Sequence, residues 1–91
     1  MLKIIWSDYL RYRAQLRGFD LNKIEEILRY SDERYYDTET GRLIAVGKQG
    51  QQLIIIPYEH DNEILTPITV HVTTRQQIRF RLKNGRFEIN E

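Results

Sequence analysis

The chain has 91 residues, enough for one folded domain with a single modest core, and 41% of them are hydrophobic, as in ordinary globular proteins. The absence of cysteine excludes disulfides, thiolate metal sites and cysteine nucleophiles, and no apolar run approaches the roughly 20 residues that a membrane span requires. The formal net charge is only +1, so any attraction to a charged partner must come from local clusters of charge.

The first third of the chain predicts a strand followed by two helices. Residues 2–6 form a short apolar run typical of a strand, and Ser7 or Asp8 can cap a helix that runs to about Arg17. Gly18 supplies a left-handed stop, and Asp20 caps a second helix. Because only a few residues separate them, the two helices are expected to form an αα-hairpin. The apolar face of the second helix comprises Leu21, Ile24, Ile27 and Leu28.

After Tyr30 the pattern changes to that of strands joined by short turns, which indicates an antiparallel meander. The run at residues 53–56 is apolar without alternation, as expected of a strand covered on both faces at the centre of a sheet. Residues 64–72 alternate and predict one further strand. The remaining strands are expected at residues 34–37 and 42–47.

Residues 74–87 fit two structures. With a period of two, Ile78, Phe80 and Leu82 share one face of a strand, and Asn84-Gly85 forms a two-residue hairpin turn. With a period of 3.6, Thr74 caps a helix that ends at Gly85. Local chemistry alone slightly favours the hairpin, and both alternatives remain open.

These elements predict a single α+β domain over residues 1–91. Its N-terminal strand and αα-hairpin pack on one face of a four- to five-stranded antiparallel sheet, and a C-terminal helix or hairpin completes it. The N-terminus lacks the charged-then-apolar pattern of a secretory leader, so the cytoplasm is the expected location.

Charge is distributed unevenly along the chain. Ten of the thirteen carboxylates lie between Asp20 and Glu63, whereas the flanking stretches 9–19 and 64–87 are basic and free of acids. If these two stretches meet in the fold, they make a positive face that attracts phosphate. The arginines and the lysine of the two stretches are Arg11, Arg13, Arg17, Arg75, Arg79, Arg81, Lys83 and Arg86.

Two arginines of the first helix fall on the arc that should face the sheet. At 100° per residue, Arg13 and Arg17 lie beside Leu10 and Ala14. Arginine is rarely buried without a partner, so one interpretation is an ion pair with Asp37 or Glu59 of the sheet. The other is that both guanidinium groups reach a groove and bind phosphate, which their planar fork suits.

Few side chains are candidates for proton transfer. His71 lies near the end of the last meander strand, on its polar side, where it is either an exposed residue without a role or a general acid or base. His60 lies in a polar turn and is expected to be exposed. Two histidines without ligand spacing predict no metal site, and no nucleotide-binding or cofactor-binding motif is present.

Several short motifs resemble the small BrnT-like proteins of the RelE toxin superfamily. In that family a helix with a histidine and two arginines leads into an Arg-Gly-hydrophobic break and a second helix; Tyr9 stands here where the histidine is expected. The matching segments are Ser7-Asp8-Tyr9-Leu10, Arg13, Arg17-Gly18-Phe19, Tyr36-Asp37, residues 40–46, residues 68–71 and the basic ending Arg81-Leu82-Lys83-Asn84-Gly85-Arg86-Phe87.

The resemblance implies a toxin-like endoribonuclease that cuts messenger RNA without a metal or cofactor and is neutralised by a cognate antitoxin protein. In this sequence the acid-free basic stretches suggest that Arg13, Arg17, Arg81 and Arg86 hold the phosphate, with proton transfer by His71 or Tyr9. This hypothesis requires that the helix of Arg13 lies next to the C-terminal basic region. An alternative is a non-catalytic module that binds RNA or protein. A homodimer through sheet-edge pairing, for which residues 34–37 could be the edge, is a further interpretation.

Overall fold

The computed structural model describes residues 2–90, which form an α+β domain with three helices and seven strands. In chain order these elements are β1 (Lys3–Ile4), α1 (Asp8–Arg17), α2 (Leu21–Tyr30), β2 (Glu33–Asp37), β3 (Arg42–Gln49), β4 (Gln52–Asp61), β5 (Ile64–Pro67), β6 (His71–Thr73), α3 (Arg75–Lys83) and β7 (Phe87–Ile89).

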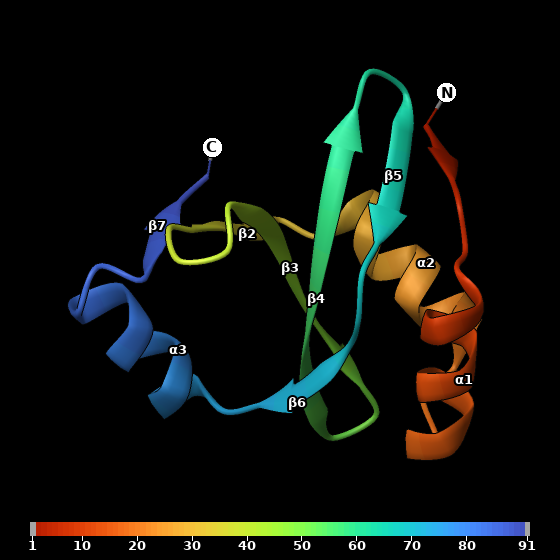
Figure 1. Cartoon of the computed structure of the whole chain (residues 1–91). Helices are drawn as coiled ribbons and strands as arrows, with labels where there is room; N and C mark the ends of the chain where they lie inside the picture. Colours follow the sequence, from red (N-terminus) through yellow and green to blue (C-terminus); the bar gives the residue numbers. More distant parts are fainter. Residues whose placement is uncertain (1, 91) are drawn as a thin grey trace.

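The helical hairpin has the predicted boundaries because its caps are local. The Ser7 hydroxyl accepts a hydrogen bond from the Leu10 amide at 3.0 Å, and Gly18 ends α1 in the left-handed conformation with φ of 75°. The Asp20 carboxylate then accepts from the Asn22 amide at 2.9 Å and begins α2. Both helices lie on the same side of the sheet (Figure 1).

The sheet is larger than predicted, and it is mixed rather than antiparallel. Its strand order is β1-β5-β4-β3-β2-β7, and β6 pairs with β4 beyond the end of β5. The β1–β5 pair is parallel, whereas the other pairs are antiparallel. The expectation of four or five strands merged β5 and β6 into one strand, included β7 only in the hairpin alternative, and left β1 outside the sheet. Segments of two or three residues are too short to show a periodicity.

The C-terminal region resolves the two alternatives in favour of a helix. Thr74 caps α3, since its hydroxyl accepts from the Gln77 amide at 3.1 Å. The hairpin interpretation is wrong, although Phe87 does begin a strand. That strand, β7, pairs with β2 instead of with residues 78–83, and the Phe87 ring stacks on Tyr35 at 5.6 Å between centroids.

Helices cover both faces of the sheet, so the molecule has two apolar clusters (Figure 1). The cluster under α1 and α2 includes Leu10, Ile24 and Ile54, whereas the cluster under α3 includes Ile78 and Phe87. Successive residues of β4 contribute to opposite clusters, as expected of a strand covered on both faces. The prediction that residues 53–56 are buried at the sheet centre is confirmed.

Two strand predictions need correction. Residues 34–37 are not a sheet edge, because β2 lies between β3 and β7. The predicted strand at residues 64–72 is two strands, β5 and β6, separated at residues 68–70. The proline at position 67 has no backbone N–H to continue the ladder, which fits a strand that ends there. The break turns the chain so that β6 runs between α1 and α3 (Figure 1).

Candidate functional site at the sheet edge

His71 is the first residue of β6, on the edge that lies between the two helical layers. Its backbone pairs with Ile55 of β4. Its ring contacts Arg13 of α1, whose Nη2 lies 2.8 Å from His71 Nδ1. Arg13 is held in place by a second hydrogen bond, from its Nε to the Val70 carbonyl oxygen at 2.9 Å. A residue of the first helix is therefore fixed against one that is 58 positions later.

The contact with Arg13 defines the tautomer of His71. A guanidinium group only donates hydrogen bonds, so Nδ1 must be the acceptor and must carry no proton. In the neutral ring the proton is then on Nε2. In this state His71 can donate a hydrogen bond from Nε2, and its basic lone pair is occupied by Arg13.

Positive charge from both helical layers acts on His71. Burial lowers the pKa of the imidazole below its usual value, and the charges of Arg13, Arg81 and Arg17, in that order, lower it further. The ring is therefore neutral at neutral pH. We call His71, Arg13, Arg17 and Arg81 the His71 cluster.

Two hollows meet at His71. The one on the α1 side has a volume of about 370 Å³ and is lined by Arg13 and Arg17, together with Phe19 and Gln52. The one on the α3 side has a volume of about 410 Å³, and its polar lining includes Thr40, Arg42, Thr69, Gln77, Arg81 and Arg86. His71 and Val72 line both hollows.

The α3-side hollow contains an unsatisfied hydroxyl group. Thr69 Oγ1 is buried and has no hydrogen-bond partner among the described residues. Buried polar atoms are normally paired, and an exception in a hollow lined by arginines is a feature of ligand-binding sites. Thr69 can donate to an anionic oxygen held in this hollow.

Arg17 and Arg81 have no carboxylate partner in the described part of the chain. Arg17 is exposed at the end of α1, and Arg81 lies over the Phe87 ring at 5.5 Å from its centroid. Their charge is therefore not neutralised by an ion pair. The interpretation that the α1 arginines pair with Asp37 or Glu59 is wrong, because Asp37 pairs with Arg86 and Glu59 pairs with Arg42.

Arg86 is engaged in a pair of its own. Its Nε and Nη2 each lie 3.3 Å from an oxygen of Asp37, and its Nε lies 3.6 Å from Glu39. Burial favours a raised pKa for the Asp37 carboxyl, but hydrogen bonds from Arg86 and the Glu39 amide, with the charge of Arg86, hold the pKa below its usual value. Arg86 thus lines the α3-side hollow with its charge balanced.

The two basic stretches meet at His71, but not through the predicted contact between the helix of Arg13 and the C-terminal region. Helices α1 and α3 lie on opposite sides of the sheet and do not contact each other side by side (Figure 1). Their arginines converge because β6 brings His71 to the edge between them. Tyr9 stands exposed one helical turn before Arg13 and lines neither hollow.

Several residues of the site gave no separate signal in the sequence. The sequence predicts only that Arg42 begins a strand, and it reaches the hollow because that strand, β3, places it opposite Asp37. Thr69, Gln52 and Gln77 are ordinary polar residues whose roles depend on the pairing of β4 with β6 and on the orientation of α3. A helical wheel drawn from Thr74 places Gln77 and Arg81 one turn apart on the same face, and this spacing is the signal in the sequence that could have placed Gln77 in the site.

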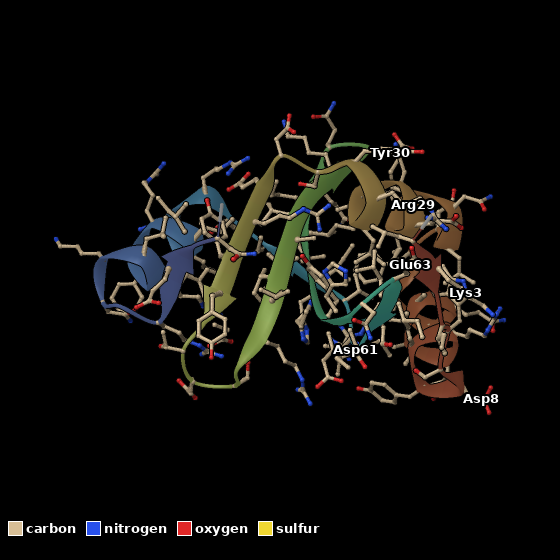
Figure 2. The ribbon with its side chains drawn as sticks, turned by 90° about the horizontal axis from the view of Figure 1, so that it is seen from above. Lys3, Asp8, Arg29, Tyr30, Asp61 and Glu63 are labelled. Atoms are coloured by element: carbon tan, nitrogen blue, oxygen red, sulfur yellow. The ribbon has the colours of Figure 1, made fainter. Side chains whose placement is uncertain are left out.

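The end of the molecule away from α3 carries charged side chains of both signs, unlike the His71 cluster. Figure 2 shows Lys3, Asp8, Arg29, Asp61 and Glu63 together at the end formed by β1, α1 and α2, away from α3. Three of these five side chains are acidic and two are basic, so together they do not concentrate positive potential. His60 is exposed, as predicted, and its Nε2 lies 2.8 Å from the Asn62 carbonyl oxygen.

Comparison with protein-family models, with curated proteins and with solved structures finds no match to this chain. In residues 2–90 no group of three or more His, Asp or Glu side chains is arranged to hold a metal ion. None of the helices described is long and apolar enough to cross a membrane.

Proposed function

We propose that this chain is a toxin-like endoribonuclease of the RelE/BrnT kind, which cleaves messenger RNA in the cytoplasm and is neutralised by a cognate antitoxin protein. The observation that carries the proposal is the His71 cluster. A neutral imidazole, surrounded by three arginines that lack carboxylate partners, suits a phosphodiester. The fold class and the acid-free basic stretches agree with the motif resemblance.

The proposed reaction is attack by a ribose 2′-oxygen on the adjacent phosphorus. The bond to the 5′-oxygen breaks, the 2′-hydroxyl proton goes to a base, and the leaving oxygen takes a proton from solvent. The products are a 2′,3′-cyclic phosphate and a 5′-hydroxyl end. Arg17 and Arg81 stabilise charge on the non-bridging oxygens, and no metal takes part.

His71 acts as the base once Arg13 releases it. Without RNA, Arg13 occupies the Nδ1 lone pair. A phosphate group offers the guanidinium a stronger, charge-assisted partner, so binding of RNA draws Arg13 away from the ring. The freed Nδ1 accepts the 2′-hydroxyl proton, and the neighbouring arginines keep the ring unprotonated until that step. His71 is preferred to Tyr9 because Tyr9 lines neither hollow.

One observation favours a second candidate, a non-catalytic module that binds RNA or protein. The resting contact from Arg13 blocks the basic nitrogen of His71, and a module that only binds phosphate needs nothing more than donors. In that case Arg13 stays hydrogen-bonded to Nδ1, and the Nε2–H group of His71 donates one further hydrogen bond to RNA.

Incubation of the purified protein with single-stranded RNA in the presence of EDTA separates these functions. The endoribonuclease gives cyclic-phosphate products, and His71→Asn lowers the cleavage rate roughly 100-fold or more while RNA binding persists. Salt-sensitive binding without any product assigns the module instead. Absence of both binding and cleavage refutes both functions.

Arg17 and Arg11 provide a matched pair of variants. Both are exposed arginines of α1, but only Arg17 belongs to the His71 cluster. Arg17→Ala removes one phosphate contact, so the slope of log affinity against log salt falls by about 0.7 for single-stranded RNA. Arg11→Ala leaves the slope unchanged. Equal effects of the two substitutions contradict the assignment of the site.

A further inference from the structure

A third hollow lies between α3 and the turn that joins β2 to β3. It has a volume of about 810 Å³, larger than either hollow at His71, and its lining comes from α3, from the turn and from the residues before β7. Its side chains include Thr38, Glu39, Gln76, Phe80, Asn84 and Arg86.

Phe80 is the unusual member of this lining. Its side chain is 65% exposed although it belongs to the most basic helix of the protein, between Arg79 and Arg81. An exposed phenyl ring contributes nothing to the core, which α3 reaches through Ile78 and Leu82. The ring presents an apolar face to the hollow, and the two arginines beside it attract negative charge.

This hollow adjoins the α3-side hollow at His71. Gln77, Arg81 and Arg86 line both. The Gln77 amide is held in place, because the Thr73 hydroxyl donates to its Oε1 at 3.1 Å and leaves the NH₂ group for a ligand. A molecule bound at His71 can therefore extend past Arg81 to Phe80.

We propose that this hollow, the Phe80 groove, binds a nucleobase of single-stranded RNA whose phosphate lies at Arg81. The base stacks on the Phe80 ring, and its edge meets the amides of Gln76 and Asn84, which both donate and accept hydrogen bonds. Base–aromatic stacking beside a cationic backbone track is how proteins bind single strands. The inference rests on the proposed function, since it names the part of the RNA that lies beside the phosphate site.

The test compares two short oligonucleotides of equal length and charge, both with 2′-O-methyl groups that prevent cleavage. One carries uracil at every position, and the other is abasic throughout. Fluorescence anisotropy measures their affinities for the wild-type chain and for Phe80→Leu, which keeps an apolar side chain but removes the aromatic face. We expect the wild type to bind the base-carrying strand roughly five- to 150-fold more tightly, and Phe80→Leu to lose that preference.

Tyr30→Leu is the matched control. Tyr30 is an aromatic residue with 75% exposure, and Figure 2 shows it at the α2 end of the molecule, far from α3. This variant should keep the wild-type preference. Circular dichroism and urea unfolding verify that all three proteins are folded.

The outcomes separate the inference from the function on which it rests. Equal binding of both strands by the wild type, still weakened by Arg17→Ala, overturns the nucleobase groove and leaves phosphate binding at His71 intact. Loss of preference in Tyr30→Leu as well as Phe80→Leu also overturns it. Failure of the wild type to bind either strand refutes the proposed function itself.

Discussion

Replacement of Arg86 by methionine should destabilise the fold, although the basic pattern of the sequence predicts a phosphate-binding role for this residue. The Asp37 side chain is only 5% exposed, and Arg86 supplies two hydrogen bonds to it at 3.3 Å. Removal of one partner from a fully buried pair costs about 3–5 kcal/mol. Arg86 is 35% exposed, and the Glu39 amide still donates to Asp37 in the variant, so we expect about 2 kcal/mol here.

Urea unfolding followed by circular dichroism measures this loss. With a slope of about 1.3 kcal/mol per molar urea, the midpoint should fall by about 1.5 M, and the melting temperature by about 10 °C. In an Asp37→Asn background, Arg86→Met should cost much less, because no carboxylate is then left without a partner. A double-mutant cycle gives the coupling between the two residues.

The pH dependence of this effect has a defined sign. The pKa of Asp37 is lowered in the folded protein, so its pair contributes stability above the ordinary aspartate pKa of about 3.9. That contribution is lost as pH falls through the lower folded value. The difference in stability between wild type and Arg86→Met should therefore be full at pH 7 and shrink below about pH 4. A coupling near zero at pH 7 would refute this assignment of Arg86.

Three further predictions concern the site and its supports. Arg13→Gln should raise the pKa of His71, because it removes the nearest positive charge, and an NMR titration of the ring protons that gives an unchanged midpoint would contradict the contact. Gly47→Ala should destabilise the protein by about 1–3 kcal/mol in urea unfolding, because the new Cβ would lie 2.5 Å from Ile27 Cγ1, and Ile27→Ala should relieve part of that cost. Thr74→Ala should cost about 1 kcal/mol by loss of the α3 cap, whereas an unaltered urea midpoint would show that the cap is dispensable.

Sequence reasoning succeeded where the determining contacts are local. Ser7, Gly18 and Asp20 define α1 and α2 through contacts within a few residues, so their effect can be read from the chain itself. The central strand was also predictable, because a strand covered on both faces must be apolar throughout.

The same reasoning failed where distant contacts decide. Asn84-Gly85 has the local chemistry of a hairpin turn, but Phe87 gains a partner in Asp37 of β2 and a stacking contact with Tyr35. Neither gain has any signature within the last seventeen residues. The pairing of Arg86 with Asp37 has the same origin, since the two lie 49 positions apart.

The site was predictable as a set of charges but not as a geometry. The acid-free basic stretches identified Arg13, Arg17 and Arg81, whereas the sequence could not show that the helices would lie on opposite faces of the sheet. The break after β5 and the pairing of His71 with Ile55 decide where they meet.

The members of the His71 cluster lie far apart in the sequence, on α1, β6 and α3, and this has a consequence during protein synthesis. Arg13 is synthesised first, its imidazole partner follows 58 residues later, and Arg81 comes after both. A nascent chain that lacks α3 carries Arg13 and Arg17 but neither Arg81 nor Phe80. Synthesis of α3 is therefore a precondition for assembly of the complete His71 cluster.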